Sequence, residues 1–320
     1  MTNAELTVAK DSSGSFTSIQ KAVDALPDTG GVIRIAAGTW NERVEIRKPG
    51  VTIIGQGSDR TTISAGYGAN MKMPDGSRRG TFRSYTMLIF THDFHAEGIC
   101  VENTAGPGRL AGQAIAVYAE GDRISFRNCR ILGAQDTLFT GPLPPAEIEP
   151  GGFTGPTKEA PRIPGRQLYE SCFISGEIDF IFGSARAYFY DCTLHAIDSG
   201  RYPDAFYCAP STNEGEAFGY VFDRCRFTGD CPKGSAFLAR PWRDYAKAVF
   251  LNCSMDSSVN PLGVDDWNKP QTHESAFFAQ YNCTGEGAGT VQTRAAFMHF
   301  LTEKEAAAFS REAVLGTDFS

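Results

Sequence analysis

The sequence predicts an all-β fold in which short strands repeat as successive coils of a solenoid. A six-residue motif recurs along the chain. It consists of an aromatic residue, any residue, a residue that is usually polar, a cysteine, any residue and an apolar residue. Copies begin at Phe126, Tyr169, Phe189, Phe222 and Phe250, and a degenerate copy surrounds Cys283. Glycine accounts for 34 of 320 residues, about half as much again as the usual ~7%, which favours many tight turns. A period of twenty-odd residues with insertions indicates a solenoid, with inward side chains stacking between coils. Ordinary strands of a β-sandwich are the alternative.

Two helices and several strands are predicted along the chain. Apolar residues share one face over residues 15–26, which predicts an amphipathic helix, and residues 31–35, 38–40 and 44–46 are predicted strands. Strands recur to about residue 295, interrupted by irregular stretches at 66–80 and 141–165. A second helix is predicted over 302–309 from the capping-box pattern of Thr302 and Glu305. We expect both helices to cap the open ends of the solenoid.

Residues 141–165 contain seven prolines and begin shortly after Asp136. Two interpretations stay open for this insertion: a disordered surface loop, and a segment that overhangs the functional site. No stretch resembles an interdomain linker. Residues 1–320 are therefore predicted to form a single domain that carries the insertion.

Charge and composition exclude several classes of function. The net charge is −7 and the pI about 5.3, which disfavours nucleic acid as a partner and favours a neutral or partly neutral substrate. The sequence has no leader-like segment and no apolar run of eighteen residues, so it predicts no membrane association and a cytoplasmic location; a signal peptide in a longer precursor would predict secretion. The nine cysteines are predicted to be reduced core residues.

Common signatures of other hydrolases are missing from the sequence. It contains no G-x-S-x-G, H-E-x-x-H or C-x-x-C pattern, and its five histidines lack the spacing of a zinc site. Serine and zinc hydrolases are therefore disfavoured, and we predict neither a metal nor a cofactor.

Two aspartates occupy equivalent positions of the repeat. Asp136 and Asp179 each follow a motif cysteine, Cys129 or Cys172, by seven residues. If the motif marks successive coils, their carboxylates lie about one strand spacing, ~4.8 Å, apart. Both cannot ionise freely at that separation, so we expect one pKa to rise while the other stays low, which suits an acid and a nucleophile. A carboxylate inside the apolar run Ile-Asp-Phe-Ile-Phe-Gly also needs a compensating partner.

The chain resembles the pectin methylesterases, or pectinesterases, over nearly its whole length. The matching segments are residues 16–27, 38–42, 102–106, 112–114, 135–138, 179–183 and 240–242. The resemblance implies a single-stranded right-handed parallel β-helix with short capping helices at its ends. It also implies hydrolysis of the C6 methyl esters of galacturonate, with release of methanol. The implied partner is methyl-esterified homogalacturonan or oligogalacturonides, and the implied state is a monomer.

The resemblance also implies roles for individual residues. Asp179 would be the nucleophile, and Asp136 the acid that protonates methanol and then the base that activates water. Arg240 would pair with Asp179, while Gln113 and Gln135 would donate hydrogen bonds to the tetrahedral oxyanion. The implied substrate contacts are Trp242, Phe182, Phe139, Tyr245 and Thr81. Taken alone, the two glutamines would suit turn capping, and the tryptophan a core position.

Three residues and the insertion depart from the family pattern. Glu177 stands where a small residue is usual, Ala239 replaces a glycine, and Trp40 a tyrosine. Because Glu177 lies two residues before Asp179 on the same strand face, it either adds negative charge to the cleft or forms an outward salt bridge. If the 141–165 insertion closes one end of the cleft, we expect short methylated oligogalacturonides to be preferred over polymer.

Three other functions remain as alternatives. A glycosidase or lyase on a similar β-helix would also use acidic residues, but the Gln135–Asp136 pair and the Asp-Phe-Ile-Phe-Gly segment disfavour both. A catalytically silent carbohydrate-binding β-helix should have lost at least one of the implied catalytic residues, and none is lost. An esterase for another sugar ester, such as an acetyl ester, would retain them all.

Overall fold

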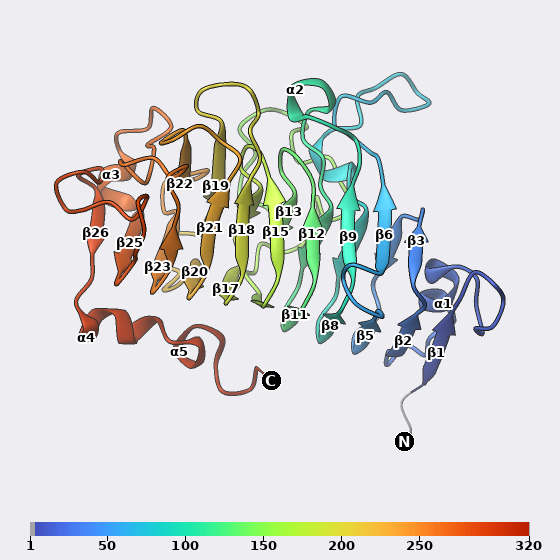
Figure 1. Cartoon of the computed structure of the whole chain (residues 1–320). Helices are drawn as coiled ribbons and strands as arrows, with labels where there is room; N and C mark the ends of the chain where they lie inside the picture. The colour runs from blue at the N-terminus through green and yellow to red at the C-terminus, as the bar shows by residue number, and fades with distance from the viewer. Residues whose placement is uncertain (1–3, 320) are drawn as a thin grey trace.

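Three parallel β-sheets run along the protein, and the chain winds from one sheet to the next in successive coils (Figure 1). The computed structural model describes residues 4–319. The strands of each sheet follow one another in chain order, so every coil lies directly on the preceding one. The predicted all-β parallel β-helix is therefore confirmed.

The strands of the three sheets are as follows. The first sheet contains β1 (Glu5–Val8), β2 (Gly31–Ile35), β5 (Val51–Ile54), β8 (Phe94–Glu97), β11 (Ile124–Arg127), β14 (Arg166–Glu170), β17 (Arg186–Tyr190), β20 (Tyr220–Asp223), β23 (Lys247–Leu251), β25 (Phe277–Tyr281) and β26 (Met298–Phe300). The second contains β3 (Gly38–Trp40), β6 (Thr61–Ala65), β9 (Cys100–Asn103), β12 (Arg130–Leu132), β15 (Phe173–Gly176), β18 (Thr193–Ala196), β21 (Arg226–Gly229) and β24 (Ser254–Met255). The third contains β4 (Val44–Ile46), β7 (Met87–Phe90), β10 (Val117–Glu120), β13 (Leu138–Thr140), β16 (Ile181–Gly183), β19 (Ala205–Pro210) and β22 (Ala236–Ala239). The strands predicted at 31–35, 38–40 and 44–46 are confirmed as β2, β3 and β4.

The repeated motif forms the corner between the first and second sheets. Its aromatic residues lie on first-sheet strands and stack inside the helix; the rings of Phe189 and Phe222, for example, are 4.6 Å apart with an interplanar angle of 15°. The polar residue, such as Asn128 with φ of 52°, has a left-handed backbone, and this turns the chain before the cysteine. Each motif copy therefore spans the end of a first-sheet strand, the corner and the start of a second-sheet strand. All nine cysteines are unpaired thiols, as predicted, and eight are buried.

The N-terminal helix α1 (Ile19–Ala25) is shorter than the predicted 15–26. Phe16 instead pairs with Val8 in an isolated parallel bridge, and Ser18 then caps the helix by accepting a hydrogen bond from the Lys21 amide. The helix packs against β1, β2 and β4 at the N-terminal end of the solenoid (Figure 1), in agreement with the predicted cap.

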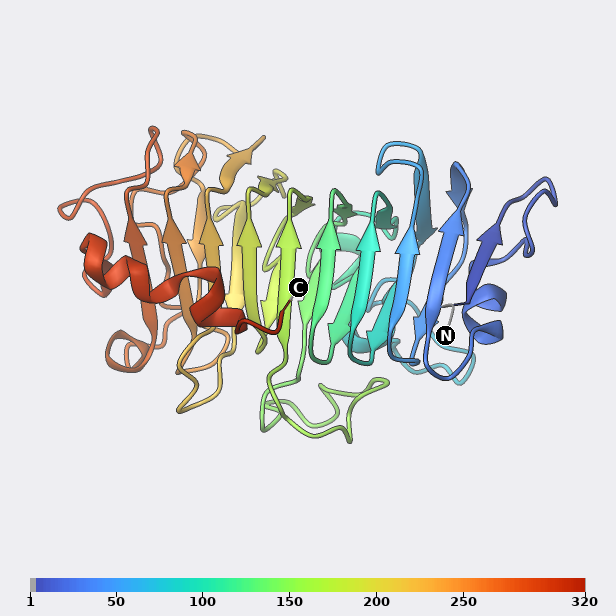
Figure 2. The same ribbon diagram turned by 90° about the horizontal axis from the view of Figure 1, so that it is seen from below.

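The C-terminal helices do not cap the opposite end. Thr302 and Glu305 form both hydrogen bonds of the predicted capping box, but the chain then runs back along the outer face of the first sheet (Figure 2). Val314 and Leu315 pack there with Tyr188 and other buried apolar residues of the sheet, which removes this apolar face from water. The predicted C-terminal end cap is therefore wrong. The C-terminal segment contains α4 (Glu303–Ala306), the 3-10 helix η2 (Ala307–Phe309) and α5 (Arg311–Leu315). Three short helices elsewhere in the chain were not predicted: η1 (Thr81–Arg83), α2 (Gly108–Ala111) and α3 (Thr272–Ser275).

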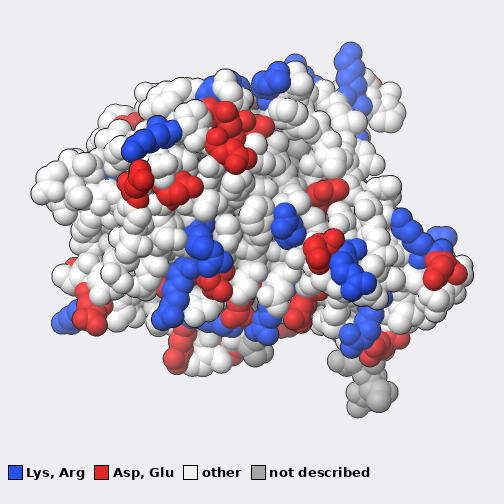
Figure 3. Space-filling view, in the orientation of Figure 1, with Lys and Arg blue, Asp and Glu red and all other residues white. Residues whose placement is uncertain are grey.

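Charged side chains of both signs are interspersed on the face shown in Figure 3. Within residues 4–319, no helix is long and apolar enough to cross a membrane. In the same range, no three His, Cys, Asp or Glu side chains are grouped as metal ligands.

Candidate active site

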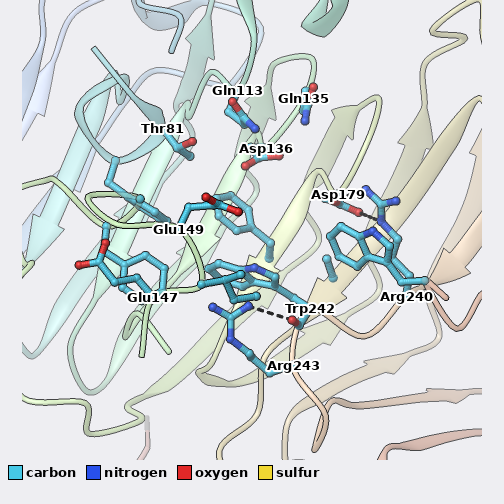
Figure 4. Close-up of a pocket in the computed structure, with 17 residues that line it drawn as sticks. Thr81, Gln113, Gln135, Asp136, Glu147, Glu149, Asp179, Arg240, Trp242 and Arg243 are labelled. Atoms are coloured by element: carbon cyan, nitrogen blue, oxygen red, sulfur yellow. Dashed lines mark hydrogen bonds and ion pairs between the residues drawn. The ribbon is translucent and has the colours of Figure 1, made fainter. Parts of the chain in front are cut away.

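A pocket of about 390 Å³ lies on the outer face of the third sheet (Figure 4). Eight of the ten predicted site residues line it, although they span the chain from residue 81 to residue 242: Thr81, Gln113, Gln135, Asp136, Asp179, Phe182, Arg240 and Trp242. The β-helix therefore brings together side chains that are far apart in the sequence.

Asp136 and Asp179 occupy the same position of two adjacent coils, as predicted. Each precedes a third-sheet strand by two residues, and β13 pairs with β16 so that Leu138 lies beside Ile181. The Asp136 amide donates to the Ile178 carbonyl at 3.1 Å, which fixes the two turns against each other. Both aspartates have a left-handed backbone, with φ of 63° and 52°, a conformation that aspartate tolerates better than most residues. The two turns project both carboxyl groups into the pocket.

The two aspartates have different electrostatic surroundings. Burial, followed by the negative charge of Asp179, raises the pKa of Asp136 well above its usual range, while Arg240 and a hydrogen bond from Gln135 partly oppose the rise. Water solvates an ionised carboxylate better than a buried site does, so burial favours the protonated form of Asp136. The predicted rise of one pKa in the pair is confirmed, and a proton donor lies beside Asp179.

Arg240 forms the predicted ion pair with Asp179. Its Nε donates to Oδ1 at 2.7 Å and its Nη2 to Oδ2 at 2.6 Å, in the bidentate geometry of the strongest charge-assisted hydrogen bonds. The guanidinium group lies between two rings, 4.0 Å from the centre of Phe206 and 3.7 Å from that of Trp267. These cation–π contacts hold the guanidinium group in place for its ion pair with Asp179.

Gln113 and Gln135 lie on neighbouring coils at one edge of the pocket. The Gln135 carbonyl accepts a hydrogen bond from the Ala114 amide at 2.9 Å, which places the two segments side by side. In Figure 4 both amide side chains lie beside Asp136. Side-chain amides there can donate to an oxygen of a molecule bound in the pocket.

The predicted aromatic contacts divide into three groups. Trp242 is half-buried and lines the pocket, where its ring meets that of Phe182 at 5.6 Å in an edge-to-face arrangement. Phe139 is fully buried between Phe82 and Phe182, so the predicted direct contact with substrate is wrong; the ring supports the pocket from beneath. Tyr245 lies outside the pocket lining, and its hydroxyl donates to Glu214 at 2.8 Å.

The sequence matches the family model described as Pectinesterase over residues 5–142 and 163–318. This chain belongs to the pectinesterase family. It is therefore a carboxylic ester hydrolase that demethylesterifies pectin.

Individual relatives agree with this assignment. Pectinesterase 31 of Arabidopsis thaliana is 32% identical over 291 residues, which cover 88% of this pectinesterase and 83% of the relative. The structure of the pectin methylesterase from carrot superposes with a TM-score of 0.81 at 28% identity, covering 97% and 93% of the two chains. A mutant pectin methylesterase in complex with a hexasaccharide superposes with a TM-score of 0.78 at 28% identity, covering 99% and 98%. The fold is accordingly the right-handed parallel β-helix of these enzymes.

The insertion of this pectinesterase is an ordered part of the pocket wall. The family match is interrupted at residues 143–162, and within this segment Glu147, Ile148, Glu149, Gly152 and Phe153 line the pocket. The ring of Phe153 lies edge-to-face against Phe82 at 5.8 Å and against Trp242 at 6.2 Å. Of the two interpretations of residues 141–165, the structure supports the segment that overhangs the site.

Glu177 has neither of the two roles considered for it. It is buried outside the pocket lining, and its Oε2 accepts a hydrogen bond from the Gly108 amide at 2.9 Å. A Cβ atom on Gly108 would lie 2.7 Å from that of Gln135, so only glycine fits between the two side chains. Glu177 therefore anchors α2 against Gln135. The other departures, Trp40 and Ala239, are buried in the core.

Several residues of the pocket escaped the sequence analysis: Phe82, Glu147, Ile148, Glu149, Gly152, Phe153, Ala209, Arg243 and Trp267. Trp267 is the most consequential of them, because it covers the guanidinium group of Arg240. Its only local signal is an aromatic residue within the polar turn Asp-Asp-Trp-Asn, which does not indicate a contact with a residue 27 positions earlier.

The insertion is attached to the β-helix through a buried carboxyl group. Thr157 donates its hydroxyl to Glu120 at 2.6 Å, and the Tyr118 hydroxyl lies 2.5 Å from that of Thr157. Burial is the main cause that raises the pKa of Glu120 to about 7, while the hydrogen bond from Thr157 lowers it. Near neutral pH the carboxyl group of Glu120 is therefore close to half ionised.

We expect Glu120→Gln to remove a pH dependence of stability. Since the folded-state pKa of about 7 lies above the ordinary glutamate value of 4.5, the folded protein binds more protons than the unfolded chain between these pH values. The stabilising contribution is full below pH 4.5 and is lost as the pH rises to 7, by about 3 kcal/mol in total. Urea unfolding at about pH 5 and pH 8 should show this loss in the wild type, and a smaller one in the variant. Glu159→Gln, an exposed change on the same insertion, should behave like the wild type; equal pH dependence in all three proteins would contradict the prediction.

Proposed function

We propose that Asp179 attacks the C6 carbonyl carbon of a methyl-esterified galacturonate and that Asp136 transfers the protons. A carboxylate oxygen of Asp179 bonds to the carbon and drives the carbonyl electrons onto oxygen. As the tetrahedral intermediate collapses, the bond to the methoxy group breaks, and Asp136 donates its proton to the departing methanol. The observation that carries this proposal is the bidentate Arg240–Asp179 pair beside an Asp136 whose pKa is raised.

The second half of the reaction uses the same residues in reverse. Asp136, now ionised, takes a proton from water as the water oxygen attacks the acyl carbon bound to Asp179. The acyl bond breaks, Asp179 regains its carboxylate, and the sugar leaves as free galacturonate. Arg240 stabilises the leaving carboxylate of Asp179, so the ion pair serves both steps.

Gln113 and Gln135 supply donors for the negative oxygen of both tetrahedral intermediates. Their positions beside Asp136 in the pocket support this role. Donors fixed in advance at such a site are typically worth about 3–4 kcal/mol each. Gln135 also contacts the segment that Glu177 anchors, so its position depends on that buried carboxyl group.

We infer that the substrate is a stretch of methyl-esterified homogalacturonan or an oligogalacturonide. Support comes from the half-exposed Trp242, whose ring can stack on a sugar face, and from the solved pectin methylesterases in complex with hexasaccharides. We propose that the enzyme acts as a monomer. The ordered insertion at one side of the pocket supports the preference for short oligomers.

Methanol release tests this function directly. We expect the wild type to release methanol from highly methylated pectin and, with a higher kcat/KM per ester, from methylated trigalacturonate, because the insertion narrows access to the pocket. Acetate release from an acetylated pectin of matched size serves as the control. Faster release of acetate than of methanol would replace the proposed substrate ester, whereas equal turnover of polymer and trisaccharide would contradict only the preference for short substrates.

A further inference from the structure

The insertion at residues 143–162 distinguishes this chain from the family pattern and is fastened at several points. Phe153 is buried against Phe82 and Trp242, and Thr157 is bonded to Glu120. Near the tip, the Ala146 carbonyl accepts a hydrogen bond from Arg243 Nη2 at 3.2 Å. These attachments fix the position of the tip, which is defined here as Glu147, Ile148 and Glu149.

The tip presents two carboxylates and one apolar side chain to the substrate pocket. All three residues line the pocket together with Asp136 and Asp179, and in Figure 4 the two glutamates lie on the Thr81 side, away from Asp179 and Arg240. Among the described residues, neither glutamate forms an ion pair within 4.0 Å, and Oε2 of Glu147 is buried without a hydrogen-bond partner in the protein. Ile148 is 69% exposed, so its side chain is free to contact a bound molecule.

The reaction itself creates the difference that such a tip can sense. A methyl-esterified galacturonate is neutral and ends in an apolar methyl group, whereas the hydrolysed product carries a negative charge. A free carboxylate near Glu147 and Glu149 experiences like-charge repulsion that water and salt only partly screen. A methyl ester at the same place avoids this repulsion and can bury its methyl group against Ile148.

We propose that the tip of the insertion selects galacturonate chains in which the sugars next to the reacting one are still methyl-esterified. Glu147 and Glu149 disfavour free carboxylates at these neighbouring positions, and Ile148 favours methyl esters there. This inference rests on the proposed function, since it concerns the same pocket. It implies that the enzyme leaves a region it has begun to hydrolyse and produces scattered free carboxylates, without long de-esterified blocks.

Arg243 also lines the pocket, and its positive charge would attract a free carboxylate and so oppose this selection. Its guanidinium group already donates to the carbonyls of Trp242 at 2.9 Å and Ala146 at 3.2 Å, and it lies 4.9 Å from the centre of the Trp242 ring. Arg240 is paired with Asp179. Arg240 and Arg243 therefore both have partners within the protein. Among the described residues, Glu147 and Glu149 have no ion-pair partner within 4.0 Å.

The test compares two substrates in one assay. Methanol release is measured from a fully methyl-esterified hexagalacturonate and from a hexagalacturonate that carries a single methyl ester, and the ratio of their kcat/KM values is the readout. We expect the wild type to prefer the fully esterified substrate, and the double variant Glu147→Gln/Glu149→Gln to lower that ratio by about three- to tenfold at low ionic strength. In about 0.5 M NaCl, where the Debye length is about 4 Å, the two proteins should converge.

A matched control separates position from net charge. Glu159→Gln removes a charge from the same insertion but outside the pocket, and it should keep the wild-type ratio. A ratio that is unchanged in the double variant, or lowered equally by Glu159→Gln, would overturn the proposal, as would a wild-type preference for the singly esterified substrate. Absence of methanol release from both substrates by the wild type would instead refute the proposed function.

Discussion

Replacing Asp179 with asparagine is expected to lower kcat for methanol release by about four to six orders of magnitude, the usual scale for the loss of a catalytic nucleophile. The amide has nearly the same shape as the carboxylate but carries no negative charge, so it cannot attack the ester carbon as Asp179 does. Its pairing with Arg240 is also weakened, because only one of the two acceptor oxygens remains. Initial rates on highly methylated pectin provide the measurement.

Two controls make the Asp179 result specific. Asp191→Asn changes an exposed aspartate that has the same left-handed backbone, with φ of 50°, and it should retain wild-type activity. Circular dichroism and urea unfolding should show that Asp179→Asn is folded. A folded variant that keeps more than about one hundredth of the wild-type kcat would mean that another group forms the bond to the substrate.

Asp136→Asn is expected to reduce activity by about 10²- to 10⁴-fold, the range typical of lost general acid–base catalysis. Burial and the charge of Asp179 raise the pKa of Asp136, so the carboxyl group stays protonated at pH values where an exposed aspartate has ionised. Since the first step needs that proton, kcat/KM of the wild type should fall as the pH rises through the raised pKa.

The shape of the pH profile distinguishes this role from a structural one. Asparagine has no proton to lose in this range, so the residual activity of Asp136→Asn should lack the alkaline fall. A variant that loses activity uniformly but keeps the alkaline fall would assign the proton donor to a different residue.

The parts of the molecule that depend on periodicity were predictable from the sequence. Stacked coils place equivalent positions above one another, so the spacing of Asp136 and Asp179 from their motif cysteines was sufficient to predict adjacent carboxyl groups. The same proximity predicted a raised pKa, but burial of Asp136 is the larger cause of the rise and the charge of Asp179 the second. The pairing of Arg240 with Asp179 was inferred only through the family resemblance, because no repeat connects those two positions.

The predictions that were wrong or missing concern contacts that leave no local pattern in the sequence. The corner within the motif was not predicted, because the left-handed residue that turns it has no fixed identity: it is Asn128 in one copy and Arg224 in another. Phe139 was assigned to the substrate through the family resemblance, yet its ring is buried beneath the pocket against Phe82 and Phe182. Trp267 was missed because its contact with Arg240 is set by the fold of a distant loop.

The pairing of β13 with β16 has a consequence for how this enzyme can diverge. The insertion lies between Asp136 and Asp179 in the sequence, but their separation in space is set by the hydrogen-bonded ladder and not by the intervening chain. The loop can therefore be lengthened, shortened or exchanged without moving Asp136 relative to Asp179. Substrate preference and bond chemistry are thus mechanically independent in this protein, so that one can evolve, or be engineered, while the other is kept.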